Sequence, residues 1–174
     1  MDRSDELHAR HIRDTLAAGG AVRSVVAASW HRSQELHKLD PASPRSPVWR
    51  LTEQEIDLAR QPLEPLIACA EGAMDRLHAA VGGVGCCVLL ADRNGVPLER
   101  RGAAGDDDTF SAWGLWVGTQ WSEGSQGTNG IGTAIAEQRP VTIHRDQHFF
   151  SRNALLSCTS SPIHDADGQL EAVI

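Results

Sequence analysis

Several features that would assign a function directly are missing from this sequence of 174 residues. No apolar run approaches the roughly 20 residues that a membrane-spanning helix needs. Acidic residues outnumber basic ones by 23 to 16, which disfavours DNA binding through the chain's own surface, because phosphate neutralisation dominates such affinity. Neither a GxxxxGKS/T phosphate loop nor a basic recognition helix is present. We therefore expect no membrane span, no P-loop nucleotide hydrolysis and no DNA-reading element in these residues.

Cysteine is also scarce, with only Cys69, Cys86, Cys87 and Cys158, and no CxxC pair occurs. Residues 1–6 are mostly polar and do not resemble a secretory signal. Both observations disfavour a disulfide framework. They predict a reduced protein of the cytoplasm.

The beginning of the chain has helical patterns. Residues 4–18 predict a polar helix, and residues 22–39 predict a second helix with an apolar stripe. That stripe must pack against another element, either the helix expected at 62–81 or the same helix of a second chain. We expect a homodimer, because helix pairing is a common mode of association in sensor domains. The prolines of residues 40–50 indicate a linker or an extended arm.

Two further helices follow. Thr52 and Glu55 have the spacing of a capping box, which predicts a short helix reaching about Arg60. Residues 62–81 carry the clearest 3.6-residue period of the chain. Two glycines then end the helical pattern.

Strands dominate the remainder. Residues 85–91 form a nearly continuous apolar run that predicts a buried strand, and an Asn-Gly turn at 92–95 returns the chain into a partner strand at 96–101. Residues 102–108 are acidic, and we expect a flexible loop there. A second hairpin turn is expected at 165–168. Further strands are predicted at 141–144, 155–163 and 169–174.

Helices that precede hairpin-connected strands indicate an α+β fold rather than parallel βαβ units. We expect an N-terminal helical segment with a proline-rich linker over residues 1–61 and a second domain over residues 62–174. The last predicted strand stops at Ile174 within the element. We therefore expect the protein to continue into a further helix and further domains.

We interpret the stretch Trp121–Pro140, WSEGSQGTNGIGTAIAEQRP, as the segment around which the rest of the chain is organised. Glycine-rich turns lead into a short helix that Thr128 or Asn129 can cap, and Pro140 ends it. A glycine-rich loop before a helix can present backbone N–H groups to an anion or small polar ligand. The alternative is an ordinary tight turn with a good cap, which is the commoner role of such a motif.

Large aromatic side chains near this stretch are the best candidates for a ligand pocket. The alternative for each tryptophan is a place in the core, since large aromatic side chains serve both roles. Asn129 and Thr133 would supply polar groups to a small, neutral or weakly polar metabolite. The candidate pocket residues are Trp113, Trp116, Trp121, Asn129, Thr133, His148, Phe149 and Cys158.

Metal and thiol chemistry are weaker hypotheses. His144, His148 and Cys158 are the best candidates for metal ligands, but their spacing matches no known signature, and we expect no metal and no cofactor. Cys86 and Cys87 lie in an apolar strand, where burial raises the pKa of a thiol and suppresses its reactivity. A thiol-based redox sensor or enzyme is the less favoured alternative, and we expect no catalysis.

Several motifs together resemble the N-terminal sensory region of bacterial sigma-54-dependent activators, of the acetoin-catabolism and dihydroxyacetone-operon regulator type. The quoted segments keep the family's order, although CTSSPI departs from the family's more usual Cys-Ser-Ala-Ala-Pro-Ile. The motifs are ASWHRS at 28–33, LDP at 39–41, VLLADRNGVPLERRG at 88–102, WSEGSQGTNGIGTAIAEQRPVTIH at 121–144, HFFSRN at 148–153 and CTSSPIHDADGQLEAVI at 158–174.

This resemblance implies a GAF domain, with a six-stranded antiparallel sheet, helices on one side and a small pocket beneath loops on the other. It also implies an AAA+ ATPase and a DNA-binding helix-turn-helix beyond this chain, so DNA would be contacted only by that absent domain. We expect a sensory domain whose small metabolite controls the ATPase. The alternative is an interaction module that responds to a metabolic enzyme. The sequence names no ligand.

Overall fold

The computed structural model describes residues 3–18, 24–43, 49–81 and 85–174. The chain divides into two compact units. The first unit comprises Met1–Pro47 with Trp121–Pro162, and the second comprises Val48–Gln120 with Ile163–Ile174. Both combine helices with antiparallel strand pairs, which confirms the predicted α+β class. The expected division at residues 61 and 62 remains a prediction.

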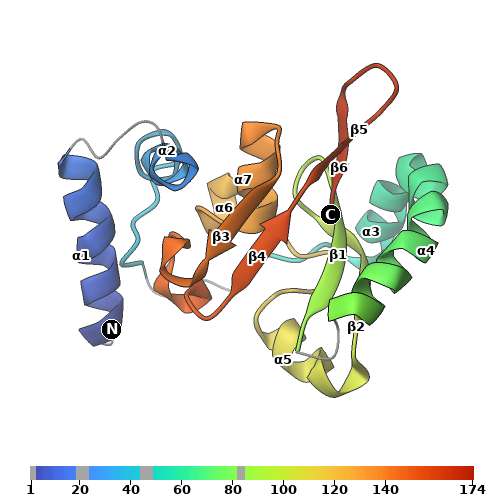
Figure 1. The fold of residues 1–174 in the computed structure, drawn as a ribbon, viewed down its shortest axis with the longest axis horizontal. Coiled ribbons are helices and arrows are strands. Elements are labelled where there is room, and N and C mark those ends of the chain that lie inside the picture. The colour runs from blue at the N-terminus through green and yellow to red at the C-terminus, as the bar shows by residue number, and fades with distance from the viewer. Residues whose placement is uncertain (1–2, 19–23, 44–48, 82–84) are drawn as a thin grey trace. The chain divides into compact units, whose positions relative to one another are not determined.

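The second unit is built on a four-stranded sheet with the order β2-β1-β6-β5 (Figure 1). Strand β1 pairs antiparallel with both β2 and β6. The predicted turn at 92–95 is present, because Gly95 N–H donates to the Asp92 carbonyl at 3.0 Å. The elements are α3 (Glu53–Arg60), η2 (Gln61–Leu63), α4 (Glu64–Val81), β1 (Cys87–Asp92), β2 (Pro97–Gly102), η4 (Ala104–Asp106), α5 (Asp107–Ala112), β5 (Pro162–His164) and β6 (Leu170–Val173).

One side of this sheet packs on α4. Ile67 and Met74, spaced at helical intervals, bury against Val88 and Leu90 of β1, together with Leu98 of β2. The predicted capping box is confirmed at the start of α3, where the Thr52 side chain accepts from Glu55 N–H and the Glu55 side chain accepts from Thr52 N–H.

The pairing of β1 with β2 contains a register shift between Leu90 and Ala91. Leu90 pairs with Glu99 and Ala91 pairs with Pro97, so Leu98 is an extra residue in β2. Beyond this bulge, Arg101 lies on the side of α4 and forms an ion pair with Asp75 at 2.6 Å. Arg100 therefore lies on the opposite side of the sheet.

The expectation of a flexible loop at 102–108 is wrong, because these residues contain η4 and the start of α5. Asp107 and Asp108 occupy the first turn of α5, where negative charge is favourable next to the helix dipole. An acidic segment is compatible with a loop, but here the two aspartates stabilise the beginning of a helix.

The first unit consists of helices around the antiparallel strand pair β3–β4, in which Val141 pairs with Ser160 and His144 with Ser157. The predicted strand at 155–163 is interrupted, since Ser161 separates β4 from β5. Figure 1 shows α7 beside β3 and β4. The elements are α1 (Arg3–Ala17), α2 (Val25–His31), the π-helix η1 (Arg32–Leu36), α6 (Glu123–Gln126), α7 (Gly130–Glu137), β3 (Val141–His144), η5 (Arg145–Gln147), η6 (Ser151–Asn153) and β4 (Ser157–Ser160).

The stretch that opens at Trp121 forms two short helices, α6 and α7. Asn129 caps α7, because its Oδ1 accepts from Gly132 N–H at 2.9 Å. The helix ends at Gln138, which adopts a left-handed conformation with φ 53°, two residues before Pro140. The cap was one of the two predicted residues, whereas the stop is the left-handed turn that precedes the proline.

The second predicted helix is present as α2 and η1 over its described residues, while Val22 lies outside them. Its stripe packs within the first unit, where Trp30 and Val26 join Ile12 of α1 and Phe149 and Phe150 in one apolar cluster. The sequence interpretation offered a different partner, either the helix at 62–81 or a second chain. Across the described residues, no helix is long and apolar enough to cross a membrane.

Candidate functional site

The structure separates the eight predicted pocket residues between the two units. Trp113 and Trp116 belong to the second unit and are partly exposed. The other six belong to the first unit, and all of these except Cys158 are buried. They are Trp121, Asn129, Thr133, His148, Phe149 and Cys158.

A largely buried ion pair in the first unit joins Arg32 to Glu123 and Glu137. Arg32 donates from Nε to Glu123 Oε2 at 2.8 Å and from Nη2 to Glu123 Oε1 at 2.9 Å. One edge of the guanidinium therefore binds the Glu123 carboxylate in a bidentate manner. Its Nη1 donates to Glu137 Oε1 at 2.8 Å. The side chain of Glu123 is 4% exposed. The two carboxylates raise the pKa of Arg32, with the hydrogen bond to Glu123 as the largest cause.

Hydroxyl groups complete this arrangement. Ser29 Oγ donates to Glu123 Oε1 at 2.5 Å and lies 2.7 Å from Thr128 Oγ1 and 3.2 Å from Thr133 Oγ1. Thr133 Oγ1 in turn accepts from Asn129 N–H at 3.3 Å. Asn129 and Thr133, which the sequence interpretation placed in a ligand pocket, thus bond to the chain itself. The network joins α2 and η1 to the glycine-rich stretch.

Glycine is required where this stretch crosses itself. A Cβ atom on Gly132 would lie 2.5 Å from Glu123 N and 2.7 Å from Trp121 O, both backbone atoms. The close approach packs the beginning of α7 directly against the chain around Trp121, which is 1% exposed. In the first unit the glycines therefore permit dense packing of the backbone.

His148 and Phe149 are fully buried. His148 Nδ1 lies 2.9 Å from the Arg145 carbonyl, and its Nε2 has no hydrogen-bond partner among the described residues. Burial lowers the pKa of His148, and the hydrogen bond to Arg145 opposes this effect. Phe149 meets Phe150 edge to face in the apolar cluster with Trp30. These two residues belong to the packed interior.

The cysteines are all unpaired by disulfide. Burial raises the pKa of Cys87, while the nearby cation of Arg100 opposes this shift to a smaller extent. Among the described residues, no group of three or more His, Cys, Asp or Glu side chains is arranged to hold a metal ion.

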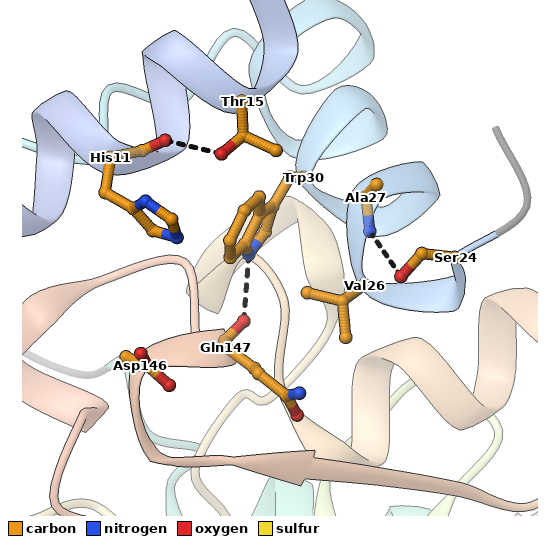
Figure 2. A pocket seen from close by; sticks show the side chains of 8 residues that line it. All are labelled: His11, Thr15, Ser24, Val26, Ala27, Trp30, Asp146 and Gln147. Atoms are coloured by element: carbon orange, nitrogen blue, oxygen red, sulfur yellow. Dashed lines mark hydrogen bonds between the residues drawn. The ribbon is translucent and has the colours of Figure 1, made fainter. Parts of the chain in front are cut away.

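A cleft of about 400 Å³ opens in the first unit between α1, α2 and residues 146–147 (Figure 2). Trp30 stands in the middle of it, where its ring meets His11 edge to face at 5.8 Å and its Nε1–H donates to the Gln147 carbonyl at 2.8 Å. The volume lies within the range of small-molecule sites. None of the eight predicted pocket residues lines this cleft.

Polar groups in the cleft mostly satisfy one another. Thr15 Oγ1 donates to the His11 carbonyl at 2.8 Å, and Ser24 accepts from Ala27 N–H (Figure 2). No lining residue carries a buried polar side-chain atom without a partner in the described part of the chain. The cleft therefore has a suitable size, but its described residues present no buried, unpartnered polar group that would fix the orientation of a ligand.

The second unit contains a different type of site, on the side of β1 and β2 that faces away from α4. Arg100 projects there, and its side chain is 10% exposed. The carbon at the centre of its guanidinium lies 4.4 Å from the Trp116 ring centroid and 5.5 Å from that of Phe110. Leu89, which pairs with Arg100 across the strands, and Trp113 are only partly buried.

Hydrogen bonding leaves one edge of Arg100 empty. Its Nη1 donates to Asp107 Oδ1 at 2.7 Å, and Asp107 is 40% exposed. Nε and Nη2 are buried, and neither has a hydrogen-bond partner among the residues that the structure describes. Planar guanidinium edges of this kind match the two oxygens of a carboxylate.

Sequence reasoning did not identify Arg100, Arg32 or Glu123 as site residues. The ASWHRS and WSEGSQG motifs contain Arg32 and Glu123, but nothing in the local pattern pairs residues that are 91 positions apart. Arg100 lies beyond the bulge in β2, which changes the side that each following residue faces. The only local signal was a pair of adjacent arginines, Arg100 and Arg101, within a predicted strand.

Comparisons with known proteins assign the family. The model of the MimR N-terminal domain matches residues 5–170. The acetoin catabolism regulatory protein of Cupriavidus necator is 31% identical over 87% of this chain and 22% of its own length. The acetoin dehydrogenase operon transcriptional activator AcoR of Bacillus subtilis is 28% identical over 95% of this chain and 27% of its own length.

The fold has a solved counterpart. A chain of the crystal structure of the E. coli DhaR(N)–DhaL complex superposes with a TM-score of 0.79 at 21% identity, covering 86% of this chain and 50% of that one. The present chain spans about a quarter of the length of the curated relatives named above. The resemblance to acetoin regulators inferred from the motifs is thereby confirmed. The chain belongs to the MimR N-terminal domain family and is a regulatory region of the kind that transcriptional activators carry.

Proposed function

We propose that this chain senses a small metabolite, which binds on the side of β1 and β2 that faces away from α4. The observation that supports this place is the group of partly exposed apolar side chains on it, Leu89, Trp113 and Trp116, next to a buried cation. The opposite side of the same strands is closed by α4. Ligand sites commonly combine apolar walls with a few polar groups.

Binding would control activity through the short elements over this side of the sheet. A ligand shifts a conformational equilibrium only if it binds the two states unequally. Residues 103–116 contain η4 and α5, which have three and six residues, and a ligand beneath them would favour one arrangement. In the complete protein this change would restrain or release an AAA+ ATPase that precedes a DNA-binding domain. We place that protein in the cytoplasm, where transcription is regulated.

We propose no catalysis by this chain. The buried thiol of Cys87 has a raised pKa and is thus mainly protonated near neutral pH, which disfavours nucleophilic attack. The two acetoin relatives are named as regulators.

The sensing proposal is tested by native mass spectrometry of the 174-residue protein, followed by a thermal-shift screen of small alcohols, ketones, diols and carboxylates. A ligand that binds only the folded state stabilises that state by mass action and so raises Tm. At a hundredfold excess over Kd, the free energy of unfolding increases by about 2.7 kcal/mol. Trp116→Ala is expected to abolish the shift. Trp49→Ala is the matched control, because Trp49 is 59% exposed.

Stabilisation that survives Trp116→Ala would contradict the proposed place and indicate the cleft at Trp30. The absence of any bound mass and of any stabilising compound would contradict small-molecule sensing itself.

Recognition of a protein partner is the second candidate function. The matched solved structure is titled as a complex of DhaR(N) with DhaL, which is a statement about that protein. In the present chain, Leu58 and Leu77 on α3 and α4 are 64% and 43% exposed. Exposed apolar side chains of this kind can form a contact with a partner or with a second copy. A homodimer therefore remains part of the proposal, and light scattering that gives the monomer mass at micromolar concentration would contradict it.

A further inference from the structure

Arg32 and Arg100 use their guanidinium groups in closely similar ways, with one difference. In both, Nη1 donates to a carboxylate that is partly exposed, Glu137 for Arg32 and Asp107 for Arg100. The Nε and Nη2 edge of Arg32 holds the two oxygens of Glu123. The same edge of Arg100 is buried and has no hydrogen-bond partner among the described residues.

An empty buried edge is unfavourable for arginine in particular. Its guanidinium stays protonated in proteins, so Arg100 cannot avoid burying charge by releasing a proton. A buried donor without a partner destabilises the folded state, and more so when it is charged. The aromatic rings of Trp116 and Phe110 interact with the cation but accept no hydrogen bond from this edge in the manner of a carboxylate.

We propose that the carboxylate of a small metabolite binds to Nε and Nη2 of Arg100, in the position that Glu123 occupies at Arg32. This proposal rests on the proposed sensing function and names the chemical class of its ligand. Leu89 pairs with Arg100 across the strands, and the ring of Trp116 lies against the guanidinium; both side chains are only partly buried and would receive the apolar part of that molecule. The ligand is therefore a short monocarboxylate with an aliphatic or aromatic body.

Neighbouring groups within the chain do not provide the missing counterion. Asp107 already binds Nη1, on the other side of the guanidinium, and remains 40% exposed. Cys87 lies close enough that the cation of Arg100 and a side-chain hydrogen bond to it both lower the thiol pKa, but burial has the larger and opposite effect. A protonated thiol carries no charge and is a weak acceptor. The buried edge of Arg100 thus remains available to an oxygen anion.

Access requires movement of the segment over Arg100. This segment consists of η4 and α5, which are three and six residues long, followed by Gly114 with φ 77°. Helices of this length have little stability of their own, so their position depends on what they pack against. A carboxylate at Arg100 would be part of that packing surface and would connect ligand binding to the position of α5.

The experiment is isothermal titration of the 174-residue protein with butyrate and, separately, with butyramide at equal ionic strength. Butyramide has the same size and lacks the charge. We expect butyrate to bind at least about tenfold more tightly, since a hydrogen-bonded charge is worth about 1.5–3 kcal/mol. Arg100→Lys, which keeps the charge and loses the planar edge, is expected to reduce the affinity for butyrate about tenfold or more.

Arg101→Lys is the matched control. Arg101 lies next in the strand but on the side of α4, where it pairs with Asp75 and Glu99, and we expect it to leave butyrate binding unchanged. Asp107→Asn provides a second variant that leaves Arg100 intact, because Asp107 is exposed enough to be replaced without unfolding the protein. Removing its negative charge is expected to keep or increase the affinity for butyrate.

The outcomes separate this proposal from the sensing function. Equal binding of butyrate and butyramide at a site that Trp116→Ala removes would overturn the carboxylate and leave sensing intact. Unchanged butyrate binding in Arg100→Lys would also overturn it. Loss of butyrate binding in Asp107→Asn would contradict the role of Arg100 as the anion-binding group.

Discussion

The two units of this protein each contain a partly buried arginine, and the two arginines differ in the groups that surround them. Arg32 of the first unit is held by two carboxylates of its own chain, so its cluster is closed. Arg100 of the second unit has one carboxylate and two aromatic rings, and among the described residues its remaining edge faces no second carboxylate. A completed cluster stabilises the fold, whereas an incomplete one retains binding capacity. The number of guanidinium donors that meet a carboxylate therefore differs between the structural network at Arg32 and the candidate ligand site at Arg100.

The largest expected effect comes from replacing each arginine by methionine. Arg32→Met leaves Glu123, 4% exposed, without its counterion, and removal of one member of a buried pair costs about 3–5 kcal/mol. Arg100→Met removes two donors that have no partner, so its loss of cation–π attraction is largely offset and we expect a change within about 1 kcal/mol. Urea unfolding of both variants measures the difference. Equal destabilisation would contradict the distinction between the clusters.

Alanine replacements of glycines beside the two arginine clusters are expected to change stability by an intermediate amount. Gly132→Ala is expected to cost about 2–3 kcal/mol, because its Cβ would meet backbone atoms of Trp121 and Glu123 that cannot move separately. Gly102→Ala would meet the end of the Arg100 side chain, which can rotate away, and we expect a smaller loss of stability. Thermal unfolding compares the two, and a larger loss in Gly102→Ala would show that Arg100 is rigidly fixed.

The smallest expected effect is a pH dependence of stability caused by the buried His148. Burial lowers the pKa of His148 below its usual value of 6.5. Just below pH 6.5, the imidazole is therefore protonated in the unfolded chain but remains neutral in the folded chain. Stability is therefore complete above pH 6.5 and is lost as the pH falls towards the folded pKa, by at most about 1.4 kcal/mol per pH unit. The neighbouring titratable groups His8 and His144 act in the same direction.

Urea unfolding between pH 7 and pH 5 measures this slope. His148→Leu is expected to flatten it, whereas His144→Gln, at an exposed position, is expected to leave most of it. An unchanged slope in His148→Leu would assign the pH dependence to another group.

Features determined by neighbouring residues could be predicted from the sequence. The capping box of Thr52 and Glu55, the cap at Asn129 and the turn at 92–95 each depend on residues at most four positions apart, and all three are present. The periodic pattern of residues 62–81 likewise predicts α4, in which Ile67 and Met74 are buried as expected, whereas Leu77 is exposed.

The remaining features depend on distant pairing. Ser29 and Glu123 meet across 94 positions, and one sequence contains no signal for such a contact. The bulge at Leu98 reverses the alternation that would have placed Arg100 on the same side as Leu98. The stripe of α2 was recognised, but its actual cover by α1 and Phe149 follows from tertiary packing. For the same reason, most of the polar pocket candidates proved to be bonded within the chain.

The side-chain Nε–H resonances of Arg100 and Arg32 in a ¹H–¹⁵N NMR spectrum report directly on whether a carboxylate binds to Arg100. Each is assigned by its loss in the corresponding lysine variant. We predict that butyrate shifts the Arg100 resonance, that butyramide does not, and that Arg32, already paired with Glu123, remains unchanged. An Arg100 resonance that is indifferent to butyrate, or that responds equally to butyramide, would contradict the assignment of a carboxylate ligand to this site.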